Sequence, residues 1–205
     1  MNEINESEER IVLLALGNSN VGKTTFILRF TENSFEKLYL STIGIDFKTK
    51  EIIFKDKQYK LFFYDTSGQE RYRSISHNMI KNADGIIIMY DITKQSSFDS
   101  VNDWVESVKV VKGDDCPMIL LGNKMDLEEK RQIKEEAGKK LADKFGIEFL
   151  EISNKENINI KEAINSILGT IIEIRGRTDS NFYSIKNTKL SKNKINNNKN
   201  NKTCC

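Results

Sequence analysis

Residues 11–24 read IVLLALGNSNVGKT, and this stretch predicts how the chain folds. Its first half, IVLLALG (11–17), is a continuous apolar run ending in glycine, which is typical of a strand buried on both faces. Its second half, GNSNVGKT (17–24), matches the pattern G-x-x-x-x-G-K-[ST] and leads into an amphipathic stretch. A glycine-rich loop between a strand and a helix turns its backbone N–H groups onto phosphate oxygens. We therefore expect Lys23 at the β- and γ-phosphates of a nucleoside triphosphate and the Thr24 hydroxyl on Mg²⁺.

Apolar runs and amphipathic stretches alternate along the chain as far as residue 175. Two of the runs, residues 43–54 and 59–66, are separated by Lys55-Asp56-Lys57 and predict a hairpin. The remaining expected elements are strands over residues 85–93, 118–124 and 147–153 and helices over residues 23–32, 97–111, 132–145 and 159–175. Alternation of this kind is typical of a sheet covered by helices. The sequence thus predicts an α/β fold, a doubly wound, mostly parallel six-stranded sheet with helices on both faces.

Charge and composition divide the chain into three parts. We expect residues 1–9 to be an acidic flexible arm, residues 10–175 a folded domain, and residues 176–205 a disordered tail rich in Asn and Lys. The net charge is +2, but residues 181–205 hold six lysines and no acid, so the body is weakly acidic. An acidic body argues against nucleic-acid binding, and a basic tail favours an anionic surface. No apolar run approaches the roughly 20 residues that span a bilayer, and the polar N-terminus is unlike a signal peptide, so we expect a cytosolic protein.

The string NKMD (123–126) closes a predicted buried strand and indicates which base is bound. Ligands of parallel α/β sheets lie at the carboxyl ends of the strands, where the phosphate loop also lies. The Asp126 carboxylate can accept two hydrogen bonds, from N1–H and the exocyclic amine of guanine, and adenine offers no such pair. Because an unpaired buried carboxylate is costly, this site should reject adenine strongly. The two motifs together predict a guanine nucleotide.

The string DTSGQE (65–70) follows the predicted strand YKLFFY and supplies hydrolytic chemistry. Asp65 is expected to hold the metal through a water molecule, and the Gly68 N–H is expected to reach the γ-phosphate. Gln69 is the candidate catalytic residue, because its side chain can orient an attacking water. Thr42, in LYLSTIGIDF, can give the metal a second hydroxyl ligand.

These motifs, in this order, resemble those of the Ras superfamily of small GTPases and, within it, the Rab family. The resemblance covers roughly residues 10–175 and includes IGIDF (43–47), QERYR (69–73), YDIT (90–93) and LLGNKMD (120–126), and a secretory-type Rab is most similar. It implies the small G domain of the P-loop NTPase fold, with GTP and GDP as ligands and Mg²⁺ as cofactor.

The resemblance also assigns roles to single residues. Phe35 corresponds to the aromatic residue that packs on guanine, Lys124 would lie along the nucleotide, and Ser153-Asn154-Lys155 stands where the family has Ser-Ala-Lys, whose backbone supports the base. Residues 35–47 and 66–81 match the two switch segments that the γ-phosphate orders. The expected nucleotide-binding set is Gly17, Asn18, Ser19, Asn20, Val21, Gly22, Lys23, Thr24, Thr25, Phe35, Thr42, Asp65, Gly68, Asn123, Lys124, Asp126, Ser153, Asn154 and Lys155.

The chain departs from the family pattern at several positions. Asn20 replaces a glycine of the phosphate loop, and asparagine tolerates a positive φ better than most residues. Ser67 replaces the alanine of DTAGQE beside the γ-phosphate, so hydrolysis is expected to differ. The family binds effectors through three aromatic residues, Phe, Trp and Tyr, and the matching positions here are Phe47, Tyr64 and Met79. Only Phe47 agrees with the family, so the family's effectors cannot be assigned to this chain. His77 is expected to be a solvated switch residue.

The chain ends on Cys204 and Cys205, far from Cys116, which is expected to be an apolar filler in a strand. A farnesylation box would need Cys at position 202, which is Lys here. Two terminal cysteines instead resemble the Rab ending that receives two geranylgeranyl groups. One lipid chain anchors only marginally and two anchor stably, and the basic tail adds attraction to anionic lipids.

The expected function is therefore a membrane-recruited GTP/GDP switch that hydrolyses GTP slowly and acts in vesicle traffic. The resemblance implies an exchange factor, a GTPase-activating protein, a prenylation escort and a GDP-dissociation inhibitor as partners. It also implies unknown effectors and a place on the cytoplasmic face of an intracellular or plasma membrane, in exchange with the cytosol. Two alternatives stay open: a GTP-binding scaffold with little hydrolysis owing to Ser67, and a P-loop ATPase or kinase with an accidental NKMD.

Overall fold

The computed structural model describes residues 9–35, 45–66 and 73–177. The chain divides into two units, residues 1–168 and residues 169–205, and each is taken by itself. The described part of the second unit, residues 169–177, is helical; the helix described over residues 160–177 begins one residue after and runs two residues beyond the expected range of 159–175. Everything below concerns the first unit.

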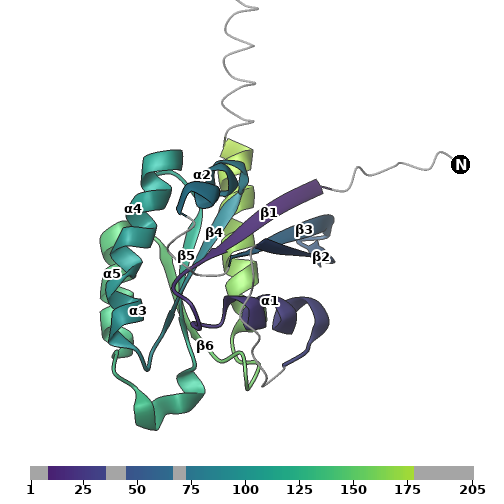
Figure 1. The fold of residues 1–205 in the computed structure, drawn as a ribbon. Helices are drawn as coiled ribbons and strands as arrows, with labels where there is room; N and C mark the ends of the chain where they lie inside the picture. The colour runs from purple at the N-terminus through teal and green to yellow at the C-terminus, as the bar shows by residue number, and fades with distance from the viewer. Residues whose placement is uncertain (1–8, 36–44, 67–72, 178–205) are drawn as a thin grey trace, which may run out of the picture. The chain divides into compact units, whose positions relative to one another are not determined.

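A six-stranded sheet with the strand order β2-β3-β1-β4-β5-β6 forms the centre of the first unit (Figure 1). The strands are β1 (Glu9–Leu16), β2 (Ile45–Phe54), β3 (Lys57–Thr66), β4 (Gly85–Asp91), β5 (Met118–Asn123) and β6 (Glu148–Ile152). Only the β2–β3 pair is antiparallel, and every other neighbouring pair is parallel. The strand order reverses at β1, between β3 and β4, and ligands of such sheets bind at this kind of reversal. The predicted α/β fold with a mostly parallel six-stranded sheet is confirmed.

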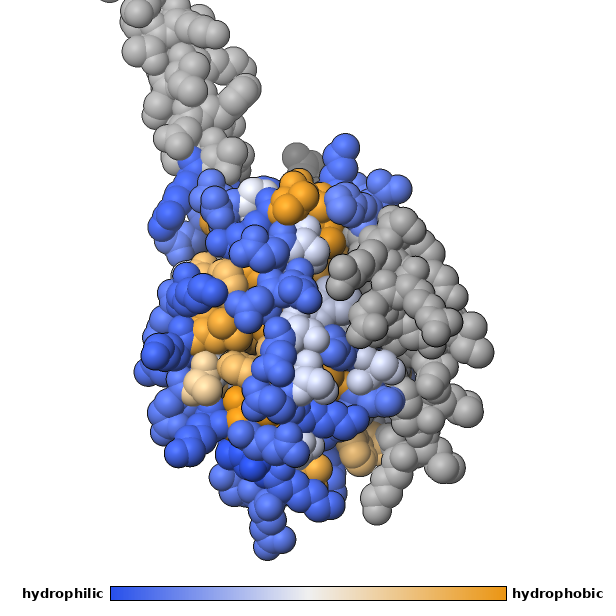
Figure 2. All heavy atoms as spheres, turned by 60° about the vertical axis from the view of Figure 1, so that its left-hand side comes forward, coloured by the Kyte–Doolittle hydropathy of each residue, from blue (hydrophilic) through white to orange (hydrophobic). Residues whose placement is uncertain are grey.

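Helices cover the sheet on both faces, as predicted. They are α1 (Lys23–Glu32), α2 (Arg73–Asn82), α3 (Gln95–Asp99), α4 (Val101–Lys112) and α5 (Glu135–Phe145), with a 3₁₀ turn η2 (Met125–Lys130) and the helical residues 160–168 at the end of the first unit. Alternate residues of β1 point to opposite faces, so Val12, Leu14 and Leu16 join a core that α2, α4 and α5 cover. Figure 2 shows the outer surface in the region of α4 and α5 as mainly hydrophilic, with hydrophobic residues in smaller patches.

Three local features differ from the sequence prediction. The hairpin turn is two residues long, because Lys55 and Asp56 both take positive φ, 50° and 60°, and Lys57 already pairs with Phe54. The helix expected over residues 97–111 is two helices that meet at Ser100, whose hydroxyl donates to the Ser96 carbonyl. Helix α2 was not predicted at all.

Candidate functional site

The phosphate loop, residues 17–22, joins β1 to α1 and adopts a backbone that few residues tolerate. Gly17 has φ +139°, and a Cβ placed there would lie 2.2 Å from the Met89 carbonyl oxygen, so β4 excludes any side chain. Gly22 has φ +103° and precedes the first turn of α1. Asn20 takes φ +64°, the positive value expected of a residue that replaces glycine. The loop therefore keeps the shape that aims backbone N–H groups at phosphate.

Lys23 is the first residue of α1, and its side chain folds back over the phosphate loop. Its Nζ donates to the carbonyl oxygens of Gly17 at 2.9 Å and Asn18 at 3.0 Å, and the residue is only 4% exposed. Burial lowers the pKa of this ammonium group to about 8, although the charge of Asp65 acts in the opposite direction. A partly desolvated cation at the centre of the loop is suited to phosphate oxygens.

Thr24 and Asp65, two of the residues predicted to hold Mg²⁺, lie together beside Lys23. The Thr24 hydroxyl, on α1, donates to Asp65 Oδ2, on β3, at 2.5 Å. Both groups are hard oxygen ligands of the kind that Mg²⁺ takes, with the rest of its shell supplied by water and phosphate. The two residues therefore fit a magnesium site. Among the described residues no cluster of three or more His, Cys, Asp or Glu side chains forms a cage for a metal.

A cavity of about 350 Å³ opens beside the phosphate loop. Its lining residues are Asn20, Gly22, Thr25, Phe35, Asn123, Lys124, Asp126, Leu127, Asn154 and Lys155. Asp126 accepts a hydrogen bond from the buried Ser153 hydroxyl at 2.6 Å, which fixes the carboxylate, and Lys155 Nζ lies 4.0 Å from its other oxygen. The cavity thus combines an oriented carboxylate with the Phe35 ring, as a guanine site requires.

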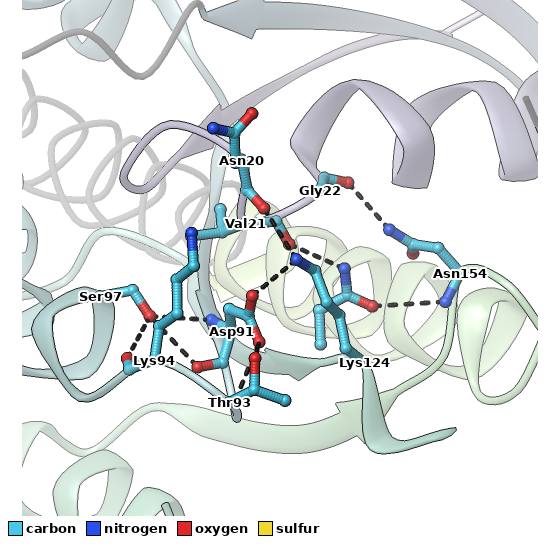
Figure 3. Close-up of polar contacts among 10 residues, drawn as sticks. Asn20, Val21, Gly22, Asp91, Thr93, Lys94, Ser97, Lys124 and Asn154 are labelled. Atoms are coloured by element: carbon cyan, nitrogen blue, oxygen red, sulfur yellow. Dashed lines mark hydrogen bonds and ion pairs between the residues drawn. The ribbon is translucent and has the colours of Figure 1, made fainter. Parts of the chain in front are cut away.

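Two successive residues, the last of β5 and the one after it, hold the phosphate loop on the side of the cavity, and Figure 3 labels the second, Lys124. Asn123 Nδ2 donates to the Val21 carbonyl at 2.8 Å, and Lys124 Nζ donates to the Asn20 carbonyl at 3.0 Å. Lys124 Nζ also lies 2.6 Å from Oδ2 of Asp91, a carboxylate at the end of β4 that is 1% exposed on its side chain. The motif NKMD therefore supports the loop as well as the cavity.

Sequence reasoning missed residues that support the site from a distance. Asn18 of the phosphate loop is held by the Trp104 indole N–H at 2.9 Å, and its Nδ2 donates to Ser100 Oγ at 3.0 Å. Arg29, on α1, donates from Nε to the Asn154 carbonyl at 2.8 Å and stacks its guanidinium 5.3 Å from the centre of the Phe35 ring. The tryptophan and an arginine two helical turns after the loop were the only sequence signals for these roles.

The predicted effector positions lie on three elements, the neighbouring strands β2 and β3 and helix α2. Phe47 of β2 is 62% exposed and stands directly opposite Tyr64 of β3 in the sheet register. Tyr64 and Met79 of α2 are partly buried against the core. His77 is an exposed residue of α2.

Several predicted residues lie outside the described part of the chain. They are Thr42, Ser67, Gly68, Gln69, Cys204 and Cys205. Cys116 is described and is buried, as expected of an apolar filler. Within the described ranges, no helix has the length and apolar character needed to cross a bilayer.

Comparisons with known proteins agree with this geometry. The model of the Ras family matches residues 11–173. The Ras-related protein Rab-3D of Homo sapiens is 47% identical over 161 residues, which are 78% of this chain and 74% of the relative. Rab-3A of Homo sapiens is 45% identical over 78% of this chain and 73% of its own length. Rab-3 of Caenorhabditis elegans is 44% identical over 78% of this chain and 74% of its own length. The chain therefore belongs to the Ras family and, within it, to the Rab group of small GTPases, GTP-hydrolysing switches that regulate vesicle traffic.

Proposed function

We propose that this chain is a membrane-recruited guanine-nucleotide switch whose nucleotide lies across the phosphate loop and the neighbouring cavity. The observation that carries the proposal is that Lys23, Thr24 and Asp65 lie together at the phosphate loop, while Asp126 lines the cavity that borders the same loop at Asn20 and Gly22. The first three suit a triphosphate and its metal. The last suits guanine, so the base and phosphates of GTP find complementary groups at the two ends.

In this proposal, hydrolysis depends on residues on both sides of the γ-phosphate. Water attacks the γ-phosphorus, the bond to the β–γ bridging oxygen breaks, and GDP and phosphate leave. Gln69 orients the water, the Gly68 N–H contacts the γ-phosphate, and Lys23 holds the oxygens that gain charge. Thr24, Thr42 and, through water, Asp65 would hold a Mg²⁺ ion, which would supply positive charge to the phosphates. The Rab family uses activating proteins in the same step, so intrinsic turnover is expected to be slow.

Membrane attachment is proposed to come from Cys204 and Cys205 as geranylgeranylated residues. Two lipid chains anchor stably where one does not, and the six lysines of residues 181–205 are attracted to anionic lipid. Rab proteins cycle between vesicle membranes and the cytosol with exchange factors, activating proteins, GDP-dissociation inhibitors and effectors. For this chain we add a prenylation escort as a partner and the cytoplasmic face of an intracellular or plasma membrane as its location.

The effector surface is proposed to include Phe47, Tyr64 and Met79. Phe47 offers an exposed ring, and Tyr64 lies opposite it on the neighbouring strand. GTP would order this surface and hydrolysis would release it. Because the second and third positions differ from the family aromatics, the effectors need not be those of other Rab proteins.

The guanine assignment is tested with Asp126→Asn. The amide replaces one acceptor by a donor, which repels the 2-amino group of guanine and matches the 2-carbonyl of xanthine. We expect weaker GTP binding and stronger binding of xanthosine triphosphate, both measured by direct titration. The matched control is Asp115→Asn, the same change at an exposed loop position outside the cavity. Unchanged GTP affinity in Asp126→Asn would overturn the assignment.

A further inference from the structure

Asn154 occupies a position that the guanine cavity and the phosphate loop share. It follows Ser153 just after β6, is 4% exposed, and belongs to the lining of the cavity. Its backbone N–H donates to Asn123 Oδ1 at 3.3 Å. Its side-chain Nδ2 donates to the carbonyl oxygen of Gly22 at 2.9 Å (Figure 3). The side chain therefore links the segment after β6 to the end of the phosphate loop.

With this bond, three successive carbonyls of the phosphate loop are held from the guanine side. Lys124 binds the carbonyl of Asn20, Asn123 that of Val21, and Asn154 that of Gly22. We call these three contacts the carbonyl clamp. The first two donors come from the end of β5, so Asn154 alone adds the segment after β6 to the clamp.

The fold gains little from this side chain. The Gly22 carbonyl already accepts the Phe26 N–H at 2.9 Å, so it does not need a second donor. Asn154 Oδ1 is buried, and within the described ranges it has no hydrogen-bond partner, which is unfavourable for stability. Alanine, the residue of the Ser-Ala-Lys pattern at this position, would have neither the bond nor the buried oxygen.

We propose that Asn154 is a positioning residue that slows nucleotide release by closing the carbonyl clamp. A nucleotide held at both its base and its phosphates leaves only after the two binding regions separate. A cross-link between them opposes that separation and so acts on the dissociation rate. The association rate, set by diffusion and orientation, changes little.

The test measures release of a fluorescent GDP analogue from the full-length, Mg²⁺-loaded protein into excess GDP. Asn154→Ala is expected to release the analogue roughly 2- to 10-fold faster, the range for loss of one hydrogen bond between neutral groups. Asn154→Asp keeps the shape but points a carboxylate at the Gly22 carbonyl, so its release should be at least as fast. Association rates should stay within about twofold of the parent protein.

Asn165→Ala, on an exposed position of the last helix, is the matched control and should release the analogue at the parent rate. Equal release rates for the parent protein and both Asn154 variants would overturn the proposal. A variant whose association slows as much as its release accelerates would also overturn it, because a general loss of structure would then explain the effect.

Discussion

The pKa of Lys23 predicts that nucleotide binding takes up a proton at mildly alkaline pH. In the structure this ammonium group is buried and bound by two carbonyls, and its pKa is lowered to about 8. Phosphate oxygens beside Nζ add negative charge, which favours the charged form and raises the pKa again. At pH 8.5 only about a quarter of the lysines are protonated before binding, so each binding event takes up about three quarters of a proton.

The sign of the pH dependence follows from this uptake. The bound form holds more protons than the nucleotide-free form, so affinity falls as the pH rises through the pKa of the free protein. With a pKa of about 8 for Lys23 in the nucleotide-free protein, and a lysine that stays charged when nucleotide is bound, the dissociation constant for GDP rises about fourfold from pH 7 to pH 8.5. This range stays below the pH at which guanine loses its own N1 proton.

Calorimetric titration of nucleotide-stripped protein with GDP, in two buffers of different ionisation enthalpy, measures the protons taken up. The control is Lys23→Arg, which binds more weakly but keeps its charge at every pH used, so its binding should take up no proton. Zero uptake by the parent protein at pH 8.5, with affinity flat over the range, would refute the account of a desolvated Lys23.

Three further predictions concern other residues. Ser67→Ala should hydrolyse preloaded GTP faster in single turnover, because a hydroxyl that holds the attacking water out of line with the γ-phosphorus raises the activation barrier. A barrier change of about 1.4 kcal/mol gives a tenfold change in rate. Equal rates for the two proteins would show that the serine is tolerated. Changing Cys204 and Cys205 to Ser should move the protein from the membrane pellet to the soluble fraction with nucleotide binding intact, and continued pelleting would refute the lipid anchor. Tyr90→Phe should raise the free energy of unfolding, measured in urea, by about 1 kcal/mol, because the buried Tyr90 hydroxyl has no hydrogen-bond partner among the described residues. A lower free energy of unfolding would show that this hydroxyl does make a hydrogen bond.

The motifs of the site could be predicted because their chemistry is local. The phosphate loop needs glycines and a lysine within eight residues, and NKMD needs only the end of a buried strand, so both are visible in contiguous sequence. The strands β1, β4 and β5 could be predicted for the same reason, since burial on both faces leaves a continuous apolar run.

The contacts that support these motifs could not be predicted, because they join distant parts of the chain. Trp104 lies 86 residues from Asn18, and Asn154 lies 132 residues from Gly22. No local pattern records such pairs. Helix α2 was missed for a different reason. Its sequence RSISHNMIKN holds only three apolar residues, too few for a helical period to be distinguished from a loop.

The choice of guanine over adenine is the central claim, and nucleotide competition tests it most directly. The full-length protein is loaded with a fluorescent GDP analogue, and unlabelled nucleotides compete for it in the presence of Mg²⁺. Because Asp126 is oriented by Ser153 within the cavity, GTP and GDP should displace the analogue at stoichiometric concentrations, whereas ATP should fail even in large excess. Displacement by ATP at concentrations comparable to those of GTP would contradict the account.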